Sequence, residues 1–212
     1  MAEMEIIETA SSGETGFSRR NFIKGVIATG AAVSSSSYVL RDGGEAIAQS
    51  AAGSVDRLIT LNVNGQTRRV DVTKQETLVV TLRYKLGLTG TKIGCDRAEC
   101  GSCTVLLDGV PHYACSVLTH NVRGRQVMTV EGLEQPDGTL HPMQQAIVDE
   151  QGFQCAFCMP GFIMSTVALL NDNPNPTRQE AAQALSGNLC RCADYEKILT
   201  SVMRAAEYTR RS

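Results

Sequence analysis

The chain has no tryptophan, and aromatic residues make up only 5% of it. It has no long low-complexity tract and no fixed-period repeat, which excludes a solenoid architecture. Neither charge sign dominates, because 20 basic and 22 acidic residues leave a formal net charge of −2. This balance gives no reason to expect a nucleic-acid partner. No G-x-G-x-x-G motif or other flavin or nicotinamide fingerprint occurs either.

Cysteine is absent from the first 94 residues, yet eight cysteines follow in two groups of four. The remaining composition is that of an ordinary globular protein, with 42% apolar and 20% charged residues. A length of 212 residues suffices for one domain or two small ones, each with a core. The cysteines are therefore the unusual feature that needs an explanation.

The N-terminal region has the pattern of an export signal. Residues 18–24 read SRRNFIK and resemble the twin-arginine motif through Arg19 and Arg20. A charge-free stretch follows over residues 25–40, short and serine-containing for a membrane span. Ala46-Ile47-Ala48 then offers a small-x-small cleavage site. The alternative is a disordered tail with a chance arginine pair.

On the export interpretation, residues 1–48 are a signal segment and residues 49–56 a small, polar linker. We therefore expect a periplasmic protein. The sequence leaves open whether the signal is cleaved. Membrane association is expected only through a partner chain or an uncleaved signal.

The first four cysteines are typical of an iron–sulfur site. Cys95, Cys100, Cys103 and Cys115 follow a C-x4-C-x2-C…C pattern, the spacing of plant-type [2Fe–2S] ligands, with an unusually close fourth cysteine. Gly94 and Gly101 allow the backbone to pass close to the sulfurs. Loop N–H groups can offset the negative charge of a cluster by ~1.5–3 kcal/mol each.

The segments around this loop predict a small domain over residues 57–132. Two hairpins are expected, because Asn-Gly and Asp-Gly pairs separate short apolar runs. A helix that ends at a glycine and a further short strand complete the pattern. In order, we expect strands at 57–63 and 66–72, a helix at 77–86, and strands at 103–107, 110–115 and 126–131. This arrangement suggests a β-grasp, ferredoxin-like domain.

The remaining residues, 133–212, predict a helical domain that carries the second group of cysteines. Helices are expected from Pro142, from Pro160, from Thr177 through a capping box with Glu180, and after Cys192. The second group comprises Cys155, Cys158, Cys190 and Cys192, in a C-x2-C-x31-C-x-C pattern. Each pair precedes a helix, and helix N-termini favour anions. The predicted fold class is thus α+β, with a β-grasp domain followed by a four-helix iron–sulfur domain.

Zinc and disulfide bonds are the alternatives to iron–sulfur clusters. Exported chains with an even number of cysteines often hold disulfides, and paired cysteines also suit structural zinc. Against them, Cys100 and Cys103 share one turn, which suits ligation, and a C-x4-C-x2-C triple fits zinc poorly. Iron–sulfur ligation is the interpretation we favour. His112, His120 and His141 are expected to be surface or packing residues.

With both groups of cysteines in view, residues 57–206 resemble the iron–sulfur subunit of the molybdenum hydroxylases, the xanthine oxidase and aldehyde oxidoreductase family. The matching motifs, in the family's order, are LGLTGTKIGCDRAECGSCTVLLDG (86–109), TVEGL (129–133), HPMQQA (141–146), GFQCAFCMPGFIMS (152–165) and LSGNLCRC (185–192). Two departures are Ala98, where the family often has glycine, and Ala193-Asp194. Neither changes a cysteine.

The resemblance implies two [2Fe–2S] clusters. Cys95, Cys100, Cys103 and Cys115 would hold the cluster distal to molybdenum, and Cys155, Cys158, Cys190 and Cys192 the proximal one. It also implies that Gln154 and Cys192 lie against a molybdopterin cofactor held by a partner chain.

No molybdopterin domain fits within this length, so substrate chemistry is expected on a large molybdopterin-binding subunit. This chain would relay electrons to a flavin subunit or a c-type cytochrome while the complex hydroxylates an aldehyde or an N-heterocycle. The rival hypothesis is a free-standing, exported two-cluster ferredoxin.

Overall fold

The computed structural model describes Ile23 and residues 58–211. Apart from Ile23, the predicted signal segment at 1–48, with Arg19 and Arg20, and the linker at 49–56 lie outside the described residues. All strands and helices below belong to one compact unit, residues 53–212. Within the described part of the chain, no helix is both long and apolar enough to cross a membrane.

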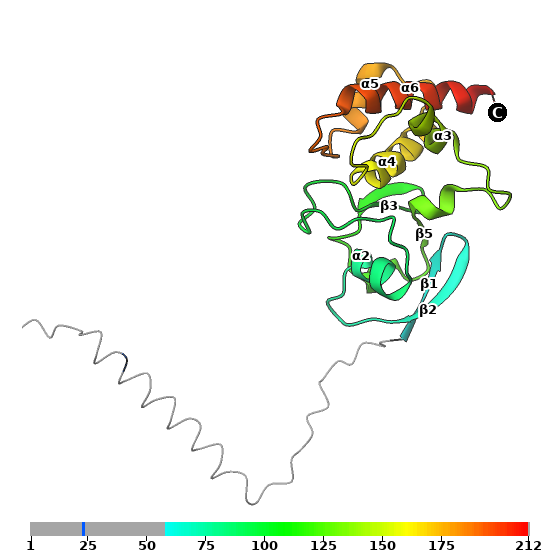
Figure 1. Cartoon of the computed structure of the whole chain (residues 1–212). Coiled ribbons are helices and arrows are strands. Elements are labelled where there is room, and N and C mark those ends of the chain that lie inside the picture. The colour runs from blue at the N-terminus through cyan, green and yellow to red at the C-terminus, as the bar shows by residue number, and fades with distance from the viewer. Residues whose placement is uncertain (1–22, 24–57, 212) are drawn as a thin grey trace, which may run out of the picture. The chain divides into compact units, whose positions relative to one another are not determined.

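The strands form one five-stranded mixed sheet in the order β2-β1-β5-β3-β4 (Figure 1). The antiparallel pair β1 (Leu58–Val63) and β2 (Gln66–Asp71) meets at Asn64-Gly65, and both turn residues have positive φ, 52° and 71°. The second predicted hairpin, β3 (Thr104–Leu107) with β4 (Val110–Tyr113), turns at Asp108-Gly109 in the same way. Both hairpin predictions are confirmed.

Strand β5 (Gln126–Met128) joins the two hairpins, parallel to β1 and antiparallel to β3. It is shorter than the predicted strand 126–131, which was wrong beyond Met128. The backbone N–H of Thr129 donates to Asn64 Oδ1 at 2.8 Å instead of pairing in the sheet, and a 3₁₀ turn, Val130–Leu133, follows.

The predicted helix at 77–86 is irregular. One α-helical turn, α2 (Leu78–Val80), passes into a π-helical segment, Thr81–Lys85. The Leu86 N–H reaches the Thr81 carbonyl at 3.0 Å, five residues back. This wider spacing is the local signature of a π-helix and is not encoded by a 3.6-residue pattern.

Four further helices cover the other end of the chain: α3 (Pro142–Asp149), α4 (Met159–Asp172), α5 (Arg178–Ala184) and α6 (Tyr195–Arg211). The predicted capping box of Thr177 and Glu180 begins α5. His141 forms a second one, because its Nδ1 accepts from the Met143 N–H at 3.2 Å. The expectation that His141 is only a surface or packing residue was therefore incomplete.

Strand β3 links the two halves because both of its faces are buried. Val105 and Leu107 belong to the core that β1, α2 and β5 share, whereas Leu106 belongs to the core of the helices. Successive strand residues point to opposite faces, so one strand serves both cores. In Figure 1, α4 lies next to β3 on the side away from α2.

Candidate iron–sulfur sites

The first cysteine group lies on the loop that leads into β3 and on the segment that leaves β4. Cys103 and Cys115 are buried, whereas Cys95 and Cys100 are partly exposed. The thiols interact in two pairs, Cys95 with Cys100 and Cys103 with Cys115. The structure therefore brings all four predicted ligands of this group together.

The ligand loop directs its own backbone N–H groups at these sulfurs. The Ala98 N–H donates to Cys115 Sγ at 3.2 Å. The N–H groups of Glu99 and Cys100 lie 3.3 and 3.4 Å from Cys95 Sγ. Asp96 and Ala98 have φ of 53° and 60°, so the loop is left-handed at two non-glycine positions. This backbone turns successive N–H groups inward, as in other anion-binding nests.

The surroundings shift the pKa values of two thiols of the first group, Cys95 and Cys103, in opposite directions. Partial burial raises the pKa of Cys95, but the N–H donors from Glu99, Arg97 and Cys100 outweigh it and hold the pKa at about 7. At Cys103 burial dominates and raises the pKa to about 12. A buried thiolate at Cys103 thus needs a nearby positive charge, and a metal ion deprotonates a coordinating thiol.

The second cysteine group lies at the starts of α4 and α6. Cys158 is the residue before α4, and Cys192 lies three residues before α6. Their partners complete two facing pairs, Cys155 with Cys192 and Cys158 with Cys190. The left-handed residues Ala156 and Ala193, each with φ of 59°, follow the two outer cysteines. The expected convergence of both cysteine pairs at two helix starts is present.

This pairing fits the chemistry of a [2Fe–2S] centre. All eight cysteines are described and all are free thiols. In a two-iron centre each iron takes two protein ligands, so two facing pairs per group match its ligand set. Bound iron and sulfide would supply one-electron redox chemistry at each group.

The second group lies close to the surface, and the exposed residues near it include apolar side chains as well as Arg191. Cys155 is exposed, and Gln154 beside it is also exposed, with its Nε2 donating to the Cys192 carbonyl at 3.3 Å. Exposed large apolar side chains come from the Cys155 loop and from the segment around Cys190. We call these four residues the apolar collar: Phe153, Phe157, Leu189 and Tyr195.

The two cysteine groups face one cavity of about 430 Å³. Its walls include Cys95, Cys100 and Ser102 from the first domain and Cys155, Cys158 and Cys190 from the helical part. The Leu189 N–H donates to the Cys100 carbonyl at 2.9 Å across this junction. The Tyr113 hydroxyl donates to the Gly187 carbonyl at 2.9 Å nearby. The sites are therefore neighbours in space, although Cys115 and Cys155 are 40 positions apart along the chain.

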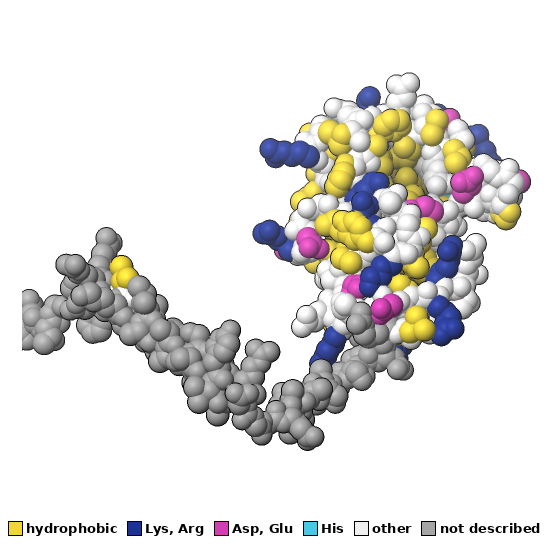
Figure 2. All heavy atoms as spheres, turned by 60° about the horizontal axis from the view of Figure 1, so that its bottom comes forward, with side chains coloured by type: hydrophobic (Ala, Val, Ile, Leu, Met, Phe, Trp, Pro, Cys, Tyr) yellow, Lys and Arg dark blue, Asp and Glu magenta, His cyan; other side chains and the backbone are white. Residues whose placement is uncertain are grey.

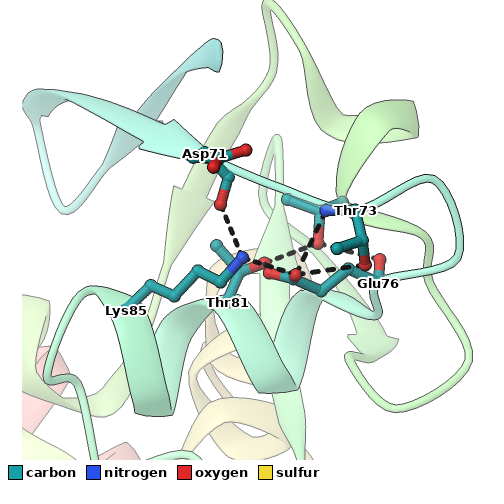
Figure 3. A network of polar contacts seen from close by, with 6 residues as sticks. Asp71, Thr73, Glu76, Thr81 and Lys85 are labelled. Atoms are coloured by element: carbon teal, nitrogen blue, oxygen red, sulfur yellow. Dashed lines mark hydrogen bonds and ion pairs between the residues drawn. The ribbon is translucent and has the colours of Figure 1, made fainter. Parts of the chain in front are cut away.

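A buried polar network fixes the helix behind the first group (Figure 3). The Glu76 carboxylate accepts from Lys85 Nζ and Thr81 Oγ1, both at 2.6 Å. Lys85 Nζ also donates to the Asp71 carbonyl at 2.5 Å, and Thr119 donates to the Glu76 carbonyl. The network joins β2, the π-helical segment and the segment after Cys115. It thereby ties the segment that follows Cys115 to this helix.

Three residues of this region were not predicted from the sequence. Asn188 bridges the two cysteine loops, Tyr113 bonds to Gly187, and the Tyr195 hydroxyl accepts the Cys190 N–H at 2.9 Å. The only signal for Asn188 was its place beside the second cysteine group, in the LSGNLCRC motif. A lone asparagine or tyrosine in a loop carries no pattern that distinguishes it from a solvated residue.

Comparison with known proteins agrees with two cluster domains. Residues 61–126 match the family described as "2Fe-2S iron-sulfur cluster binding domain", and residues 129–203 match "[2Fe-2S] binding domain". Both matches argue against zinc and disulfides as the role of the cysteines.

Relatives are similar over most of their own length. The chain is 46% identical to the nicotine 6-hydroxylase small subunit of Paenarthrobacter nicotinovorans, over 69% of this chain and 88% of that one. It is 44% identical to one subunit of the nicotinate dehydrogenase of Pseudomonas putida, over 72% of this chain and 97% of that one. It is 42% identical to the iron–sulfur-binding subunit of an Escherichia coli K12 aldehyde oxidoreductase, over 70% of this chain and 71% of that one.

Solved structures are similar to the same part of the chain. The quinoline 2-oxidoreductase structure from Pseudomonas putida 86 matches with a TM-score of 0.69 and 39% identity, over 73% of this chain and 96% of that one. The Desulfovibrio desulfuricans aldehyde oxidoreductase matches with a TM-score of 0.69 and 41% identity, over 73% of this chain and 17% of that one. The chain therefore belongs to the family of iron–sulfur subunits, with two [2Fe–2S] domains, that transfer electrons in molybdenum hydroxylases and aldehyde oxidoreductases.

Proposed function

We propose that this chain takes electrons from a molybdopterin cofactor on a large partner chain and passes them on through its two cysteine groups. Cys155, Cys158, Cys190 and Cys192 hold the proximal [2Fe–2S] cluster in this proposal, and Cys95, Cys100, Cys103 and Cys115 the distal one. The domains are a β-grasp, ferredoxin-like domain over residues 57–132 and a four-helix domain over residues 133–212.

The observation that carries this proposal is the apolar collar around Cys155. Its members Phe153, Phe157, Leu189 and Tyr195 are 43%, 46%, 52% and 42% exposed. Phe157, Leu189 and Tyr195 line the same cavity as Cys155, and Phe153 lies two residues before Cys155 in the sequence. Exposed aromatic and aliphatic side chains of this kind are typical of the buried centre of a protein interface. A partner seated there would cover the most exposed sulfur of the chain and would place its cofactor next to it.

Gln154 is the residue that we propose to touch that cofactor, together with Cys192. Its amide is exposed beside the collar and has one hydrogen bond within the chain, to the Cys192 carbonyl. The amide oxygen and one N–H remain for a ligand. Gln154 can therefore hold the Cys192 backbone and still bind a polar group of the partner's cofactor.

The substrate class follows from the names of the relatives, which act on nicotine, nicotinate, quinoline and aldehydes. We propose that the complex oxidises an N-heterocycle or an aldehyde. We also propose that the distal group passes electrons to a flavin subunit or a c-type cytochrome. On the face in Figure 2, charged side chains of both signs are interspersed.

The decisive experiment is to purify the chain from its native host with whatever remains bound to it. We expect it to retain a large molybdopterin-containing subunit. On reduction, we expect two distinct [2Fe–2S] paramagnetic signals from this chain. A chain that purifies alone with both clusters, and that no co-expressed large subunit binds, would support the rival free-standing ferredoxin.

Variants of Gln154 test the contact with the cofactor. Gln154→Ala should keep both clusters and slow the reduction of the proximal cluster by substrate in the assembled complex. Gln179→Ala, an exposed glutamine on α5, is the matched control and should behave as wild type. Equal reduction rates in the two variants would remove Gln154 from the proposed contact.

The twin-arginine motif supports a further proposal, that the folded, cluster-loaded chain is exported to the periplasm. Arg19→Lys together with Arg20→Lys should leave loaded protein in the cytoplasm, because the paired arginines are what the export route recognises. Fractionation of cells followed by immunodetection measures this directly. Unchanged periplasmic protein in the double variant would overturn the proposal.

A further inference from the structure

Asn188 lies at the junction of the two cysteine groups and is 4% exposed. Its Nδ2 donates to the Gly101 carbonyl at 3.1 Å and lies 3.5 Å from Thr104 Oγ1. Its Oδ1 accepts from Ser165 Oγ of α4 at 2.8 Å. Both ends of the amide are thus engaged, and each end holds a different part of the fold. A side chain fixed in this way cannot rotate without leaving a buried polar group unpaired.

Next to the Asn188 side chain, the backbone at Gly101 lies in direct contact with the backbones at Gly161 and Gly187. A Cβ on Gly101 would lie 2.5 Å from the Gly187 carbonyl oxygen, and a Cβ on Gly161 would overlap the Gly101 oxygen. Three glycines from three segments therefore meet where no side chain fits. The amide of Asn188 supplies the polar partner that this close approach requires.

The close approach creates one short link between the two cysteine groups. Leu189, the residue before Cys190, donates its N–H to the carbonyl of Cys100 itself at 2.9 Å. One hydrogen bond and the covalent bonds of Cys100, Leu189 and Cys190 thus form a continuous path between a predicted ligand of one cluster and a predicted ligand of the other. Electronic coupling decays less steeply along covalent and hydrogen bonds than across empty space. This link is therefore a favourable route for an electron.

We propose that Asn188 is a positioning residue for electron transfer between the two cysteine groups. Its amide holds the Cys100–Gly101 backbone against the Leu189–Cys190 backbone, and the Leu189–Cys100 hydrogen bond is the connection that it maintains. The proposal rests on the electron relay proposed above. One electron leaves the second group and one arrives at the first, and no covalent bond forms or breaks.

The test is Asn188→Ala in the cluster-loaded chain. Loss of the amide should raise amide hydrogen exchange at Leu189 about tenfold, because one buried hydrogen bond changes the open population by about that factor. The magnetic interaction between the two reduced clusters, seen as splitting of their paramagnetic signals, should weaken. Electron transfer between the clusters should slow, while each cluster keeps its own signal.

The matched control is Thr177→Ala, which removes the capping box of α5 without touching the junction. It should lower the stability of the helical domain and leave the splitting and the exchange at Leu189 unchanged. Loss of splitting in the control as well would mean that general destabilisation, rather than the position of Asn188, is responsible. Unchanged splitting and exchange in Asn188→Ala would overturn the proposal directly.

A milder variant covers the case in which Asn188→Ala fails to assemble. Ser165→Ala removes only the bond that fixes Asn188 Oδ1 and should shift both measurements in the same direction by a smaller amount. Wild-type values in Ser165→Ala, with Asn188→Ala not assembling, would also overturn the proposal. Failure of the relay itself is distinguishable, because it would show as missing clusters or no reduction by substrate in the wild-type complex.

Discussion

At the scale of single residues, the backbone conformation next to each cysteine group determines where the cysteine sulfur atoms can lie. Asp96, Ala98, Ala156 and Ala193 all adopt positive φ close to a cysteine. A left-handed conformation costs a non-glycine residue roughly 1–2 kcal/mol. The fold tolerates this strain at both groups, and at the first group the strained residue Ala98 donates its N–H to a sulfur. Such strain is typical of sites where geometry serves function.

Gly101 illustrates a stricter requirement, and we predict that Gly101→Ala disrupts the junction. The new Cβ would meet the Gly187 carbonyl and Asn188 at 2.5 Å, in addition to the strain at φ of 71°. Gly109→Ala is the control, because its φ is 85° but no atom lies within 4 Å. The control should cost only about 1 kcal/mol of strain. If Gly101→Ala and Gly109→Ala had the same thermal unfolding midpoint, this account would be contradicted.

A second prediction at this scale concerns the assignment of ligands to clusters. Cys158→Ser should abolish one paramagnetic signal and leave the other, because its facing partner is Cys190 and not a residue of the first group. Cys103→Ser should do the reverse, because it pairs with Cys115. Iron content should fall by about half in each variant, since the proposal assigns one two-iron centre to each group. Loss of both signals in either variant would contradict this assignment of the cysteines to two clusters.

At the scale of elements, the π-helical segment and its buried network hold the first group in place. Glu76 is 8% exposed, and its partner Lys85 is better solvated. Burial raises the pKa of Glu76, but hydrogen bonds from Lys85, Thr81 and the Thr73 backbone outweigh this and leave the pKa below its usual value. The carboxylate is thus stabilised in its charged form.

This pKa predicts how stability depends on pH. A carboxyl group with a depressed folded-state pKa stabilises the fold above its unfolded-state pKa of ~4.3, and this contribution is lost as the pH falls through the folded-state value. Glu76→Gln should therefore lower the free energy of unfolding near neutral pH by about 2 kcal/mol. It should also flatten the acid side of the profile. The exposed control Glu134→Gln should leave the profile unchanged, and parallel profiles for Glu76→Gln and wild type would count against the network.

At the scale of the whole molecule, the two cores depend on each other. Leu106 of β3 packs among the helices while its neighbours pack under the sheet. The cysteine loops meet through Leu189, Asn188 and Tyr113. Removal of either cluster should therefore change the stability of all of residues 58–211.

We predict that removal of iron lowers the thermal midpoint of both domains together. Metal that binds only the folded state contributes its binding free energy to folding, and both groups adjoin the same junction. Calorimetry of loaded and chelated protein should show one cooperative transition at a lower temperature after iron removal. Two separate transitions, with one unshifted, would show that the domains are energetically independent.

Much of this arrangement could be predicted because its determinants are local. The Asn64-Gly65 and Asp108-Gly109 turns and the Thr177 capping box each depend on residues within a few positions of one another. The π-helical segment and the early end of β5 were missed. Their hydrogen bonds run to atoms that the local pattern does not specify, such as Asn64 Oδ1, 65 residues from Thr129.

By itself, the sequence determined that this protein holds two groups of four cysteines with iron–sulfur spacing, one in a hairpin-rich segment and one at helix starts. Ligand spacing within a loop is a local property, so it can be read from residue order. Only the tertiary structure decided which cysteines face each other and that the two groups share one cavity. Asn188 and Gly101 are 87 residues apart, and only packing of α4 against β3 brings them within 3.1 Å.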